Sequence, residues 1–333
     1  TKLILASGIP GCGRKDRLKN WEEYAVQRGK KVKVFNVGEM MFEVASQMGQ
    51  PLNRVNVLNT GRSRLEDLRC AVFNQIGGEI SNSAANEYDA FVLCVHTMFY
   101  WKTQYIVAFD KYLNQFSPDL YITFIDSHPN ISERLNGREQ WQDENLNEAK
   151  ILEWQGLEGD ITARFADIAC RPFFVVPTVE SPALFYRLVF HPEIETVYSA
   201  MPISHFTDPK DRKIIDDFIT QLNQYFVVFN PLSVEVVGAV NTDKKKVTEN
   251  ADPAVYHHII YRDLNWFVRR ANKTIVFWPE RKPPKDLKDN ELRELWPRVI
   301  PSPGVNHETH AAFTQGKDVW VICLHDEVSP FVT

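Results

Sequence analysis

The sequence is poor in cysteine and has no long apolar run. Its five cysteines are scattered over 333 residues and none forms a C-x-x-C pair. This excludes a disulfide framework and a thiolate zinc site. No apolar run is long enough to span a bilayer, and no charged-then-apolar leader precedes Thr1. We therefore expect a protein of the reducing cytoplasm that has no membrane partner.

The chain also lacks a marked excess of either charge. Lys and Arg together number 38 and Asp and Glu number 43, which gives a net charge of -5. Such a balance provides no overall attraction to nucleic acid, so we expect a small molecule as the partner. The length predicts two domains of about 150 residues each.

Short apolar segments alternate with helical stretches through the first half of the chain. The expected strands are Leu3–Ser7, Lys31–Phe35, Asp89–Cys94, Leu120–Ile125 and Phe173–Val176. Alternation of this kind predicts an α/β domain with a mostly parallel sheet flanked by helices. Prolines flank a short helical stretch at 181–195, so we expect a linker there, between domains at 1–180 and 196–333.

A glycine-rich turn follows the first expected strand. It reads Gly8-Ile9-Pro10-Gly11-Cys12-Gly13-Arg14-Lys15, and a helix is expected from Asp16 to about Arg28. Strand, glycine-rich turn and helix form a common phosphate cradle, because backbone N–H groups close around an anion at the helix N-terminus. The candidate nucleotide-binding residues are Gly8, Gly11, Gly13, Arg14 and Lys15. The alternative is a tight turn of purely structural purpose.

The glycine-rich turn, Val34–Met41 and Val95-His96-Thr97 together resemble the archaeal adenylate kinases over about residues 1–180. The resemblance implies a P-loop nucleoside monophosphate kinase fold with a nucleotide bound at the loop. Arg14 stands at the position of the family's P-loop lysine, Lys15 at that of its magnesium-binding Ser or Thr, and Cys94 at that of an acidic residue. We therefore expect a degenerate loop that binds nucleotide with little dependence on magnesium and transfers no phosphate.

Three further arginines are candidate phosphate ligands beside this loop. Arg17 is in the expected helix, and the resemblance places Arg134 and Arg138 where the family has its lid arginines. The alternative is a solvated helix face.

The second half repeats the α/β pattern. A strand is expected at 196–202, a helix from Pro209 capped by Asp208, a strand at 226–229 and a polar loop at 238–253 containing Lys244-Lys245-Lys246. A helix at 263–272, a strand at 274–278 and a charged helical insert at 283–298 follow.

The last expected helix carries a candidate carboxylate. Asn306 is a good N-cap and Gly316 a good helix end, which places Glu308 in the first turn. Free N–H groups and the helix dipole there favour an ionised Glu308, although a capping role is the alternative. We expect Val319–Leu324 to follow as a strand covered on both faces.

The ordered set Tyr198, Asp263, Ser302, Gly304 and Glu308 resembles the nucleoside 2-deoxyribosyltransferase superfamily, and within it the 2′-deoxynucleoside 5′-monophosphate N-glycosidases, over about residues 196–325. The resemblance implies that Glu308 attacks the anomeric carbon, Tyr198 orients it and Asp263 helps to protonate the base. Ser302, with Gly304 and Asn306, would hold the substrate phosphate. It also implies a homo-oligomer, a dimer formed through this domain, and no required cofactor.

The alternatives for these residues are structural. Tyr198 would hydrogen-bond within the sheet, and Asp263 would serve only as a helix N-cap. His307 and His310 flank Glu308, but their spacing does not match H-E-x-x-H, so we expect no metal.

The sequence thus favours a two-domain α/β enzyme that cleaves or exchanges the N-glycosidic bond of a nucleotide or nucleoside. Two alternatives remain open. One is a nucleotide kinase with an appended sensor domain, and the other is a nucleotide-binding regulatory protein without turnover.

Overall fold

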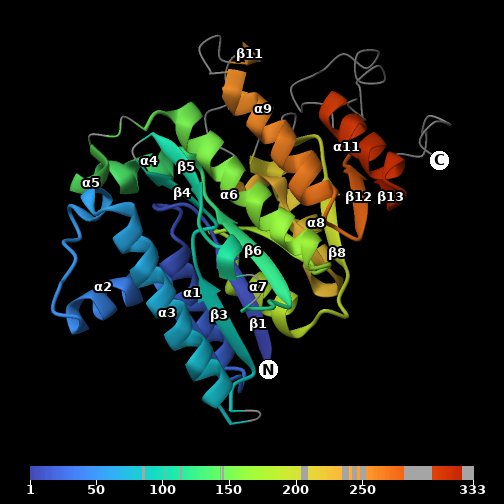
Figure 1. The fold of residues 1–333 in the computed structure, drawn as a ribbon. Helices are drawn as coiled ribbons and strands as arrows, with labels where there is room; N and C mark the ends of the chain where they lie inside the picture. Colours follow the sequence, from blue (N-terminus) through green and yellow to red (C-terminus); the bar gives the residue numbers. More distant parts are fainter. Residues whose placement is uncertain are drawn as a thin grey trace, which may run out of the picture. The chain divides into compact units, whose positions relative to one another are not determined.

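The computed structural model describes residues 1–84, 87–101, 103–112, 115–142, 144, 146–203, 209–234, 240–241, 246–247, 253–280 and 302–324. The chain divides into two compact units, the first formed by 1–191 and 252–258 and the second by 192–251 and 259–333. Both are α/β (Figure 1). The stretch expected as a linker, 181–195, contains helix α7 (Pro182–Phe190), which packs against α1 (Arg14–Val26) in the first unit.

The first unit is organised around a five-stranded parallel sheet. Its order is β2-β3-β1-β6-β7, with every neighbouring pair parallel. The strands are β1 (Lys2–Ser7), β2 (Val32–Asn36), β3 (Ala90–Cys94), β6 (Leu120–Ile125) and β7 (Phe173–Pro177). The sequence predicted each of them to within two residues, because both faces of such a sheet are covered and its strands are short continuous apolar runs.

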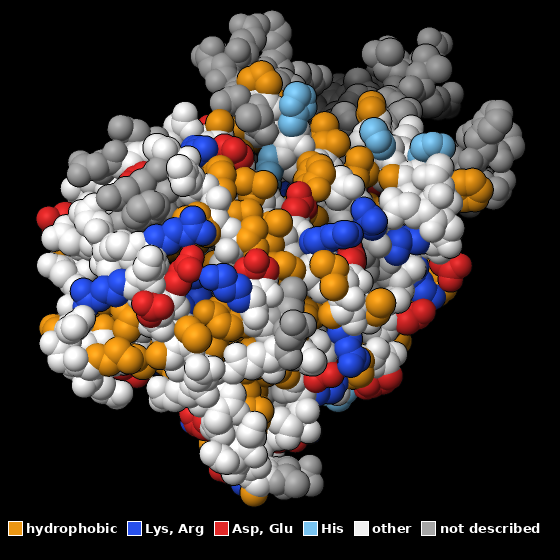
Figure 2. Space-filling view, in the orientation of Figure 1, with side chains coloured by type: hydrophobic (Ala, Val, Ile, Leu, Met, Phe, Trp, Pro, Cys, Tyr) orange, Lys and Arg blue, Asp and Glu red, His pale blue; other side chains and the backbone are white. Residues whose placement is uncertain are grey.

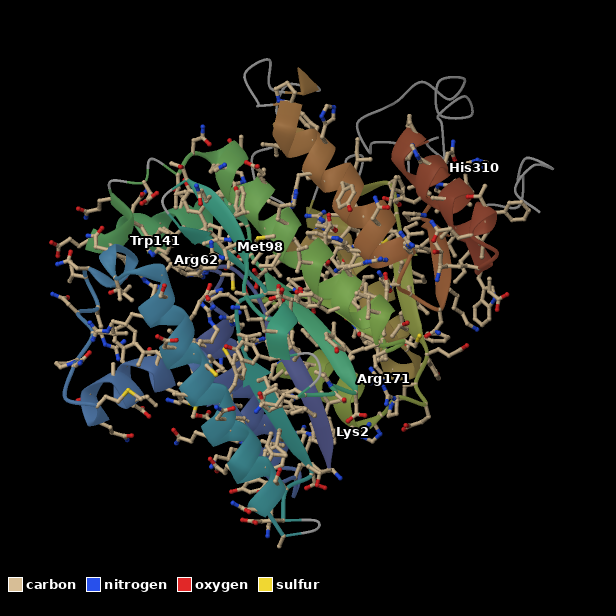
Figure 3. The ribbon with its side chains drawn as sticks, in the orientation of Figure 1. Lys2, Arg62, Met98, Trp141, Arg171 and His310 are labelled. Carbon is tan, nitrogen blue, oxygen red and sulfur yellow. The ribbon has the colours of Figure 1, made fainter. Side chains whose placement is uncertain are left out.

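Helices cover this sheet, and they place polar segments at the carboxyl ends of its strands. They include α2 (Val37–Gln47), α3 (Arg62–Asn82), α4 (His128–Asn136), α5 (Glu139–Gln142) and α6 (Glu148–Ile168). Helix α6 packs against β6 and β7, and it also contacts β4 (Met98–Trp101), which forms a hairpin with β5 (Gln104–Val107). Trp141, labelled with Met98 in Figure 3, packs against Trp154 with ring centroids 5.4 Å apart and ring planes tilted by 52°.

The second unit contains a four-stranded parallel sheet. Its order is β13-β12-β8-β9, formed by β8 (Thr196–Ala200), β9 (Val227–Phe229), β12 (Lys273–Trp278) and β13 (Asp318–Cys323). Its helices are α8 (Pro209–Tyr225), the π-helical segment η5 (Arg262–Val268) and α11 (Pro303–Thr314). Helix α9 (Pro253–Tyr261) precedes η5, and most of it belongs to the first unit. Ile215, Met201 and Phe277 are buried together between α8 and the sheet.

Three local predictions for this unit are wrong. Strand β13 is an edge strand with a half-exposed Trp320, so it is not covered on both faces. Helix α11 begins at Pro303 with Ser302 as its N-cap, since Ser followed by Pro at N1 is a stronger start than Asn306. Asp263 is no N-cap, because helical structure begins ten residues earlier, at Pro253.

Other predictions fall outside the described residues. They are the Asp208 cap, most of the 238–253 loop with Lys244 and Lys245, and the insert at 283–298.

Surface charges are mixed on the face drawn in Figure 2, where blue and red side chains alternate. Helix α3 illustrates this, since Glu66 accepts from both Arg62 and Lys111 at 3.0 Å. Across the described parts of the chain, every helix is too short or too polar to traverse a bilayer.

Candidate phosphate-binding cleft

The Gly8–Arg14 loop follows β1, the central strand of the first sheet. Gly8, Gly11 and Gly13 have φ angles of +150°, +82° and +83°, a region that side-chain-bearing residues rarely adopt. A Cβ on Gly8 would lie 2.8 Å from the Phe124 carbonyl oxygen and 2.9 Å from Cys12 Sγ. The glycines are therefore required by the loop's shape, and ligands of parallel α/β sheets bind at this carboxyl edge.

A buried carboxylate from a distant helix holds the start of this loop. Glu158 Oε1 accepts from Gly8 N at 3.0 Å and from Thr97 N at 2.9 Å, and Oε2 accepts from Met98 N at 2.7 Å. Glu158 is fully buried. Burial raises the pKa of this carboxyl, whereas the Thr97 N–H and the Arg14 charge act to lower it.

The Arg14 side chain folds back onto the loop. Its Nη1 donates to the Gly8 carbonyl oxygen at 2.8 Å and also to the Val95 carbonyl oxygen. Its charge interacts with the buried Cys94 and Cys12 thiols. Arg14 thus joins the end of β1 to the end of β3. It lines the cleft, but its Nη1 is turned to the two carbonyl oxygens, unlike the outward cation expected of a P-loop lysine.

Arg134 contacts the loop from helix α4. Its Nη1 donates to the Gly11 carbonyl oxygen at 2.8 Å and to Asp126 Oδ2 at 2.5 Å. Asp126 is buried and also accepts from Asn130 at 2.9 Å. The second expected lid arginine, Arg138, lines the cleft, whereas Arg17 does not and is influenced electrostatically by Glu180.

A cleft of about 780 Å³ opens from this loop. Its lining contains the loop together with Arg134, Arg138 and Cys94–His96. It also contains apolar side chains of α2, α3, the segment between these helices and β4, namely Phe42, Leu52, Val55, Leu65, Phe73 and Phe99, with Arg54 and Arg69. The volume of the whole cleft is near the upper end of the range for ligand pockets, which is about 300–1,000 Å³.

Lys15 lies at the cleft and is paired. Its ammonium is 3.2 Å from Glu39 Oε1, and Glu39 Oε2 accepts from Arg54 at 2.6 Å. The hydrogen bond from Arg54, and the Lys15 contact after it, hold the pKa of the Glu39 carboxyl below its usual value. Two cations therefore share one carboxylate, which leaves a net positive charge in this part of the cleft.

Magnesium is the ion expected of a P-loop kinase, but the residues present do not fit a protein-held ion. Lys15 replaces the hydroxyl ligand, and the buried Cys94 interacts with Arg14. No cluster of three His, Cys, Asp or Glu side chains suited to a metal occurs in the described ranges. The charge next to a bound phosphate is therefore provided by guanidinium and ammonium groups.

In the second unit, the structure brings Tyr198 and Glu308 together. The Tyr198 hydroxyl donates to Glu308 Oε1 at 2.8 Å. Tyr198 is fully buried, and burial, with the charges of Glu308 and Asp263, raises its pKa well above the ordinary value. Glu308 lies in the second turn of α11, so the argument from free first-turn N–H groups does not apply to it.

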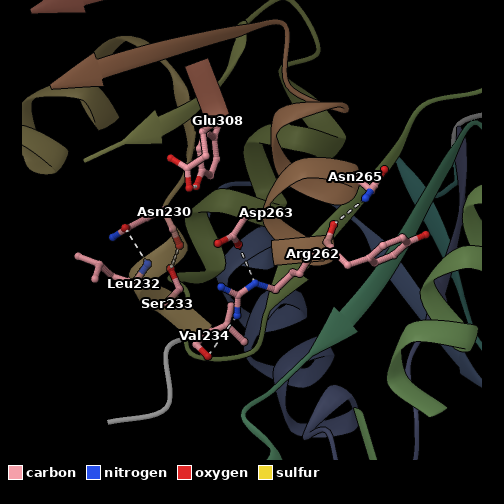
Figure 4. A network of polar contacts seen from close by, with 10 residues as sticks. Asn230, Leu232, Ser233, Val234, Arg262, Asp263, Asn265 and Glu308 are labelled. Atoms are coloured by element: carbon pink, nitrogen blue, oxygen red, sulfur yellow. Dashed lines mark hydrogen bonds and ion pairs between the residues drawn. The ribbon is translucent and has the colours of Figure 1, made fainter. Parts of the chain in front are cut away.

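Asp263 is paired with its neighbour. Its Oδ1 accepts from Arg262 Nε at 2.8 Å, and both residues are buried (Figure 4). Burial raises the pKa of Asp263, while Arg262 acts to lower it. Ser302 caps α11 by accepting from Val305 N at 3.4 Å, and Gly304 and Asn306 are exposed on the first turn.

Sequence reasoning missed Glu158 and Arg69. A signal for Glu158 exists, since it shares the buried face of α6 with Ile151, Trp154 and Thr162, at spacings of three and four residues. An acidic residue in the middle of an apolar stripe requires a partner. Arg69 carries no comparable signal, because its helix also has arginines on its exposed side.

Comparison with known families finds a match within the first unit. An AAA domain family, a P-loop kinase-like domain, matches residues 7–151. Similar solved structures include a deoxyadenosine kinase from M. mycoides, with 13% identity and a TM-score of 0.32 over 57% of this chain and 98% of that chain. A shikimate kinase from Acinetobacter baumannii has 9% identity and a TM-score of 0.36 over 58% of this chain and 96% of that chain. A shikimate kinase from Bacteroides thetaiotaomicron has 9% identity and a TM-score of 0.32 over 52% of this chain and 86% of that chain. No curated protein matches.

These findings overturn the function expected from the C-terminal resemblance. The family match lies in the first unit, and none of the comparisons supports a deoxyribosyltransferase-like unit at 196–333. The assignment of N-glycosidase or deoxyribosyltransferase activity is therefore wrong. An ordered set of five common residues was too unspecific a pattern to carry an activity.

Proposed function

We propose that the first unit binds a nucleoside triphosphate at the Gly8–Arg14 loop and transfers its terminal phosphoryl group to a small acceptor, a nucleoside monophosphate being the first to test. The observation that carries this is a single cleft of about 780 Å³, whose lining combines the glycine loop with apolar side chains of α2, α3 and β4. One cavity with both kinds of lining can hold donor and acceptor together, as an in-line displacement needs.

The apolar part of the lining supports an acceptor with an apolar body and an anionic group. Arg69 lines the same cleft as Phe73 and Phe99, and desolvation lowers the pKa of its guanidinium. A partly desolvated cation among aromatic rings favours an anion with a flat apolar body. The acceptor oxygen would attack the terminal phosphorus as the bond to the bridging oxygen breaks, which yields a diphosphate and releases the acceptor proton.

The pairing of Lys15 reduces one objection to transfer. A free ammonium here would repel a metal cation bound to the nucleotide, but Lys15 is paired with Glu39 at 3.2 Å. Because Lys15 is exposed, solvent screens the remaining repulsion. Arg138, which lines the cleft, can stabilise the charge that develops during transfer.

The test is a coupled assay for ADP with ATP and each nucleoside monophosphate, using the full chain. Arg69→Gln provides the first variant, with Arg64→Gln, an exposed arginine on the same helix and outside the cleft lining, as its control. We expect turnover that falls about tenfold or more in Arg69→Gln and is unchanged in Arg64→Gln. Absence of ADP formation with every acceptor would overturn transfer.

A second candidate function is nucleotide binding without turnover. It is favoured by the Arg14 geometry, in which the residue at the P-loop lysine position is committed to two loop carbonyls. Nucleotide binding in calorimetry without ADP formation would select it.

Both candidate functions include a bound nucleotide. Both also include a location in the reducing cytoplasm, which five free cysteines favour. Dimerisation through 196–333 stays a prediction, to be tested by light scattering.

A further inference from the structure

Both backbone polar groups of Gly8 are hydrogen-bonded to side chains of opposite charge. Its N–H donates to Glu158 Oε1 at 3.0 Å, and its carbonyl oxygen accepts from Arg14 Nη1 at 2.8 Å. Glu158 comes from α6, 150 residues along the chain. The shape of the loop's first residue is therefore set by a helix remote in sequence.

The same two side chains reach the segment that follows β3. Arg14 donates to the Val95 carbonyl oxygen, and Glu158 accepts from Thr97 N and Met98 N. The Thr97 hydroxyl adds a bond to the Glu158 backbone oxygen at 3.2 Å. Two loops that both border the cleft are thus tied to each other by one cation and one anion.

These contacts occupy Arg14 Nη1, and Arg14 Nε is buried. If Arg14 Nη1 turned to a phosphate, the Gly8 and Val95 carbonyl oxygens would lose their donor, and a buried acceptor without a partner costs free energy. The fully buried Glu158 would then lose part of the Arg14 charge that favours its ionised form. The first-turn N–H groups of α1 can bind an anion without any such rearrangement.

We propose that Arg14 and Glu158 are a pair of positioning residues that fix the shape of the phosphate-binding loop before a ligand arrives, and that Arg14 does not bind the phosphate. This rests on the part of the proposed function that places phosphate at the Gly8–Arg14 loop, and not on phosphoryl transfer. A loop fixed in advance binds more tightly because less entropy is lost on binding.

The sign of the Glu158→Gln effect separates this role from simple electrostatics. Removing a negative charge near an anion site should tighten anion binding by Coulomb's law alone. A glutamine, however, turns an N–H₂ group towards either the Gly8 and Thr97 N–H groups or the Met98 N–H group, so part of the arrangement is lost. Positioning therefore predicts weaker binding.

The experiment measures pyrophosphate and ATP binding to the full chain by calorimetry, in chelator and in magnesium. Variants are Glu158→Gln, Arg14→Met and the double variant, with Arg14→Lys as the conservative rescue. Controls are the exposed Glu153→Gln on α6 and the exposed Arg28→Met in the turn after α1. Backbone amide exchange of the ligand-free wild-type protein at Gly8, Thr97 and Met98 gives a readout that needs no variant to fold.

We expect slow exchange at these three amides, and binding about tenfold or more weaker in Glu158→Gln and Arg14→Met. The double variant should be little worse than either single one, because the two side chains act as a unit, and Arg14→Lys should recover part of the loss. Unchanged or tighter binding in Glu158→Gln, or fast exchange at Gly8 and Thr97 in the wild type, would overturn the proposal.

The outcome is distinguishable from that of the proposed function. Binding that depends on both residues without any ADP formation would uphold the positioning pair and reject the kinase. Turnover in the wild type together with unchanged binding in Glu158→Gln would uphold the kinase and reject the positioning pair.

Discussion

The hydroxyl of Tyr198 and a carboxylate oxygen of Glu308 lie 2.8 Å apart, although 110 residues separate them in the chain. Tyr198 is on the fully buried strand β8, and Glu308 is on α11, which packs against β8. The pairing of these two residues therefore belongs to the packing of the second unit, whatever chemistry that unit performs.

Replacing Tyr198 by Phe should destabilise the protein by about 1–2 kcal/mol, because half-buried Glu308 would lose a donor and a cavity would replace the hydroxyl. Urea denaturation of the full chain would measure this. The control is Tyr225→Phe, since Tyr225 is largely exposed. Equal stabilities of the two variants would show that the hydrogen bond contributes nothing.

Replacing Gly8 by Ala should destabilise the protein and abolish phosphate binding. The new Cβ would lie 2.8 Å from a backbone oxygen that cannot move away, at a φ of +150°. Gly78→Ala is the matched control. Gly78 is in helix α3 with no atom near its added Cβ, so alanine there should stabilise by about 0.5–1 kcal/mol. Thermal unfolding and calorimetry would check both effects.

Cys12 should be unreactive at neutral pH. Burial raises the pKa of its thiol to about 11, which leaves almost no thiolate at pH 8. The exposed Cys70 and Cys170 should react with iodoacetamide first, and mass spectrometry would identify the sites.

Between about pH 9 and 11 the folded protein binds the Cys12 proton more tightly than the unfolded chain, so this thiol should make stability fall as pH rises. Rapid labelling of Cys12 at pH 8 would contradict the prediction.

Replacing Lys15 by Thr should make ATP binding more dependent on magnesium. The change removes a cation and introduces a hydroxyl where P-loop kinases hold the ion. One unit repulsion at about 4 Å is worth about 4 kcal/mol at an effective dielectric near 20, and exposure of Lys15 reduces it. We expect magnesium to strengthen binding several-fold more in the variant than in the wild type, measured by calorimetry. Lys19→Thr, exposed on the same helix, is the control.

The sequence allowed the fold of the first unit to be predicted because its signals are local. Three glycines within six residues, Gly8, Gly11 and Gly13, predict the turn, and each parallel strand is a short apolar run. The environment of that turn could not be predicted, since Glu158 reaches it from 150 residues away and Arg14 folds back where the motif implies an outward cation.

In the second unit, wrongly predicted helix starts led to wrong expectations for the Glu308 and Asp263 side chains. Choosing Asn306 over Ser302 as the cap moved Glu308 into a first turn that it does not occupy, and with it the reason for expecting a free carboxylate. The helix expected to begin at Asp263 begins at Pro253, so its candidate cap is an interior residue paired with Arg262. Helix starts are the least certain part of such predictions because neighbouring Ser, Asn and Asp residues compete as caps.

The position of β1 in the middle of its sheet has a consequence for synthesis of the chain. Strand β1 precedes both of its neighbours, β3 and β6, in the chain, since Lys2 pairs with Ala90 and Ser7 with Thr123. The ribosome therefore synthesises β1 long before the strands that pair with it. A ribosome that adds about 5–20 residues per second therefore leaves the apolar segment Leu3–Ala6 unpaired for several seconds or more. Parallel pairing over such separations folds slowly. The nascent first unit should consequently depend on chaperones until β6 has emerged.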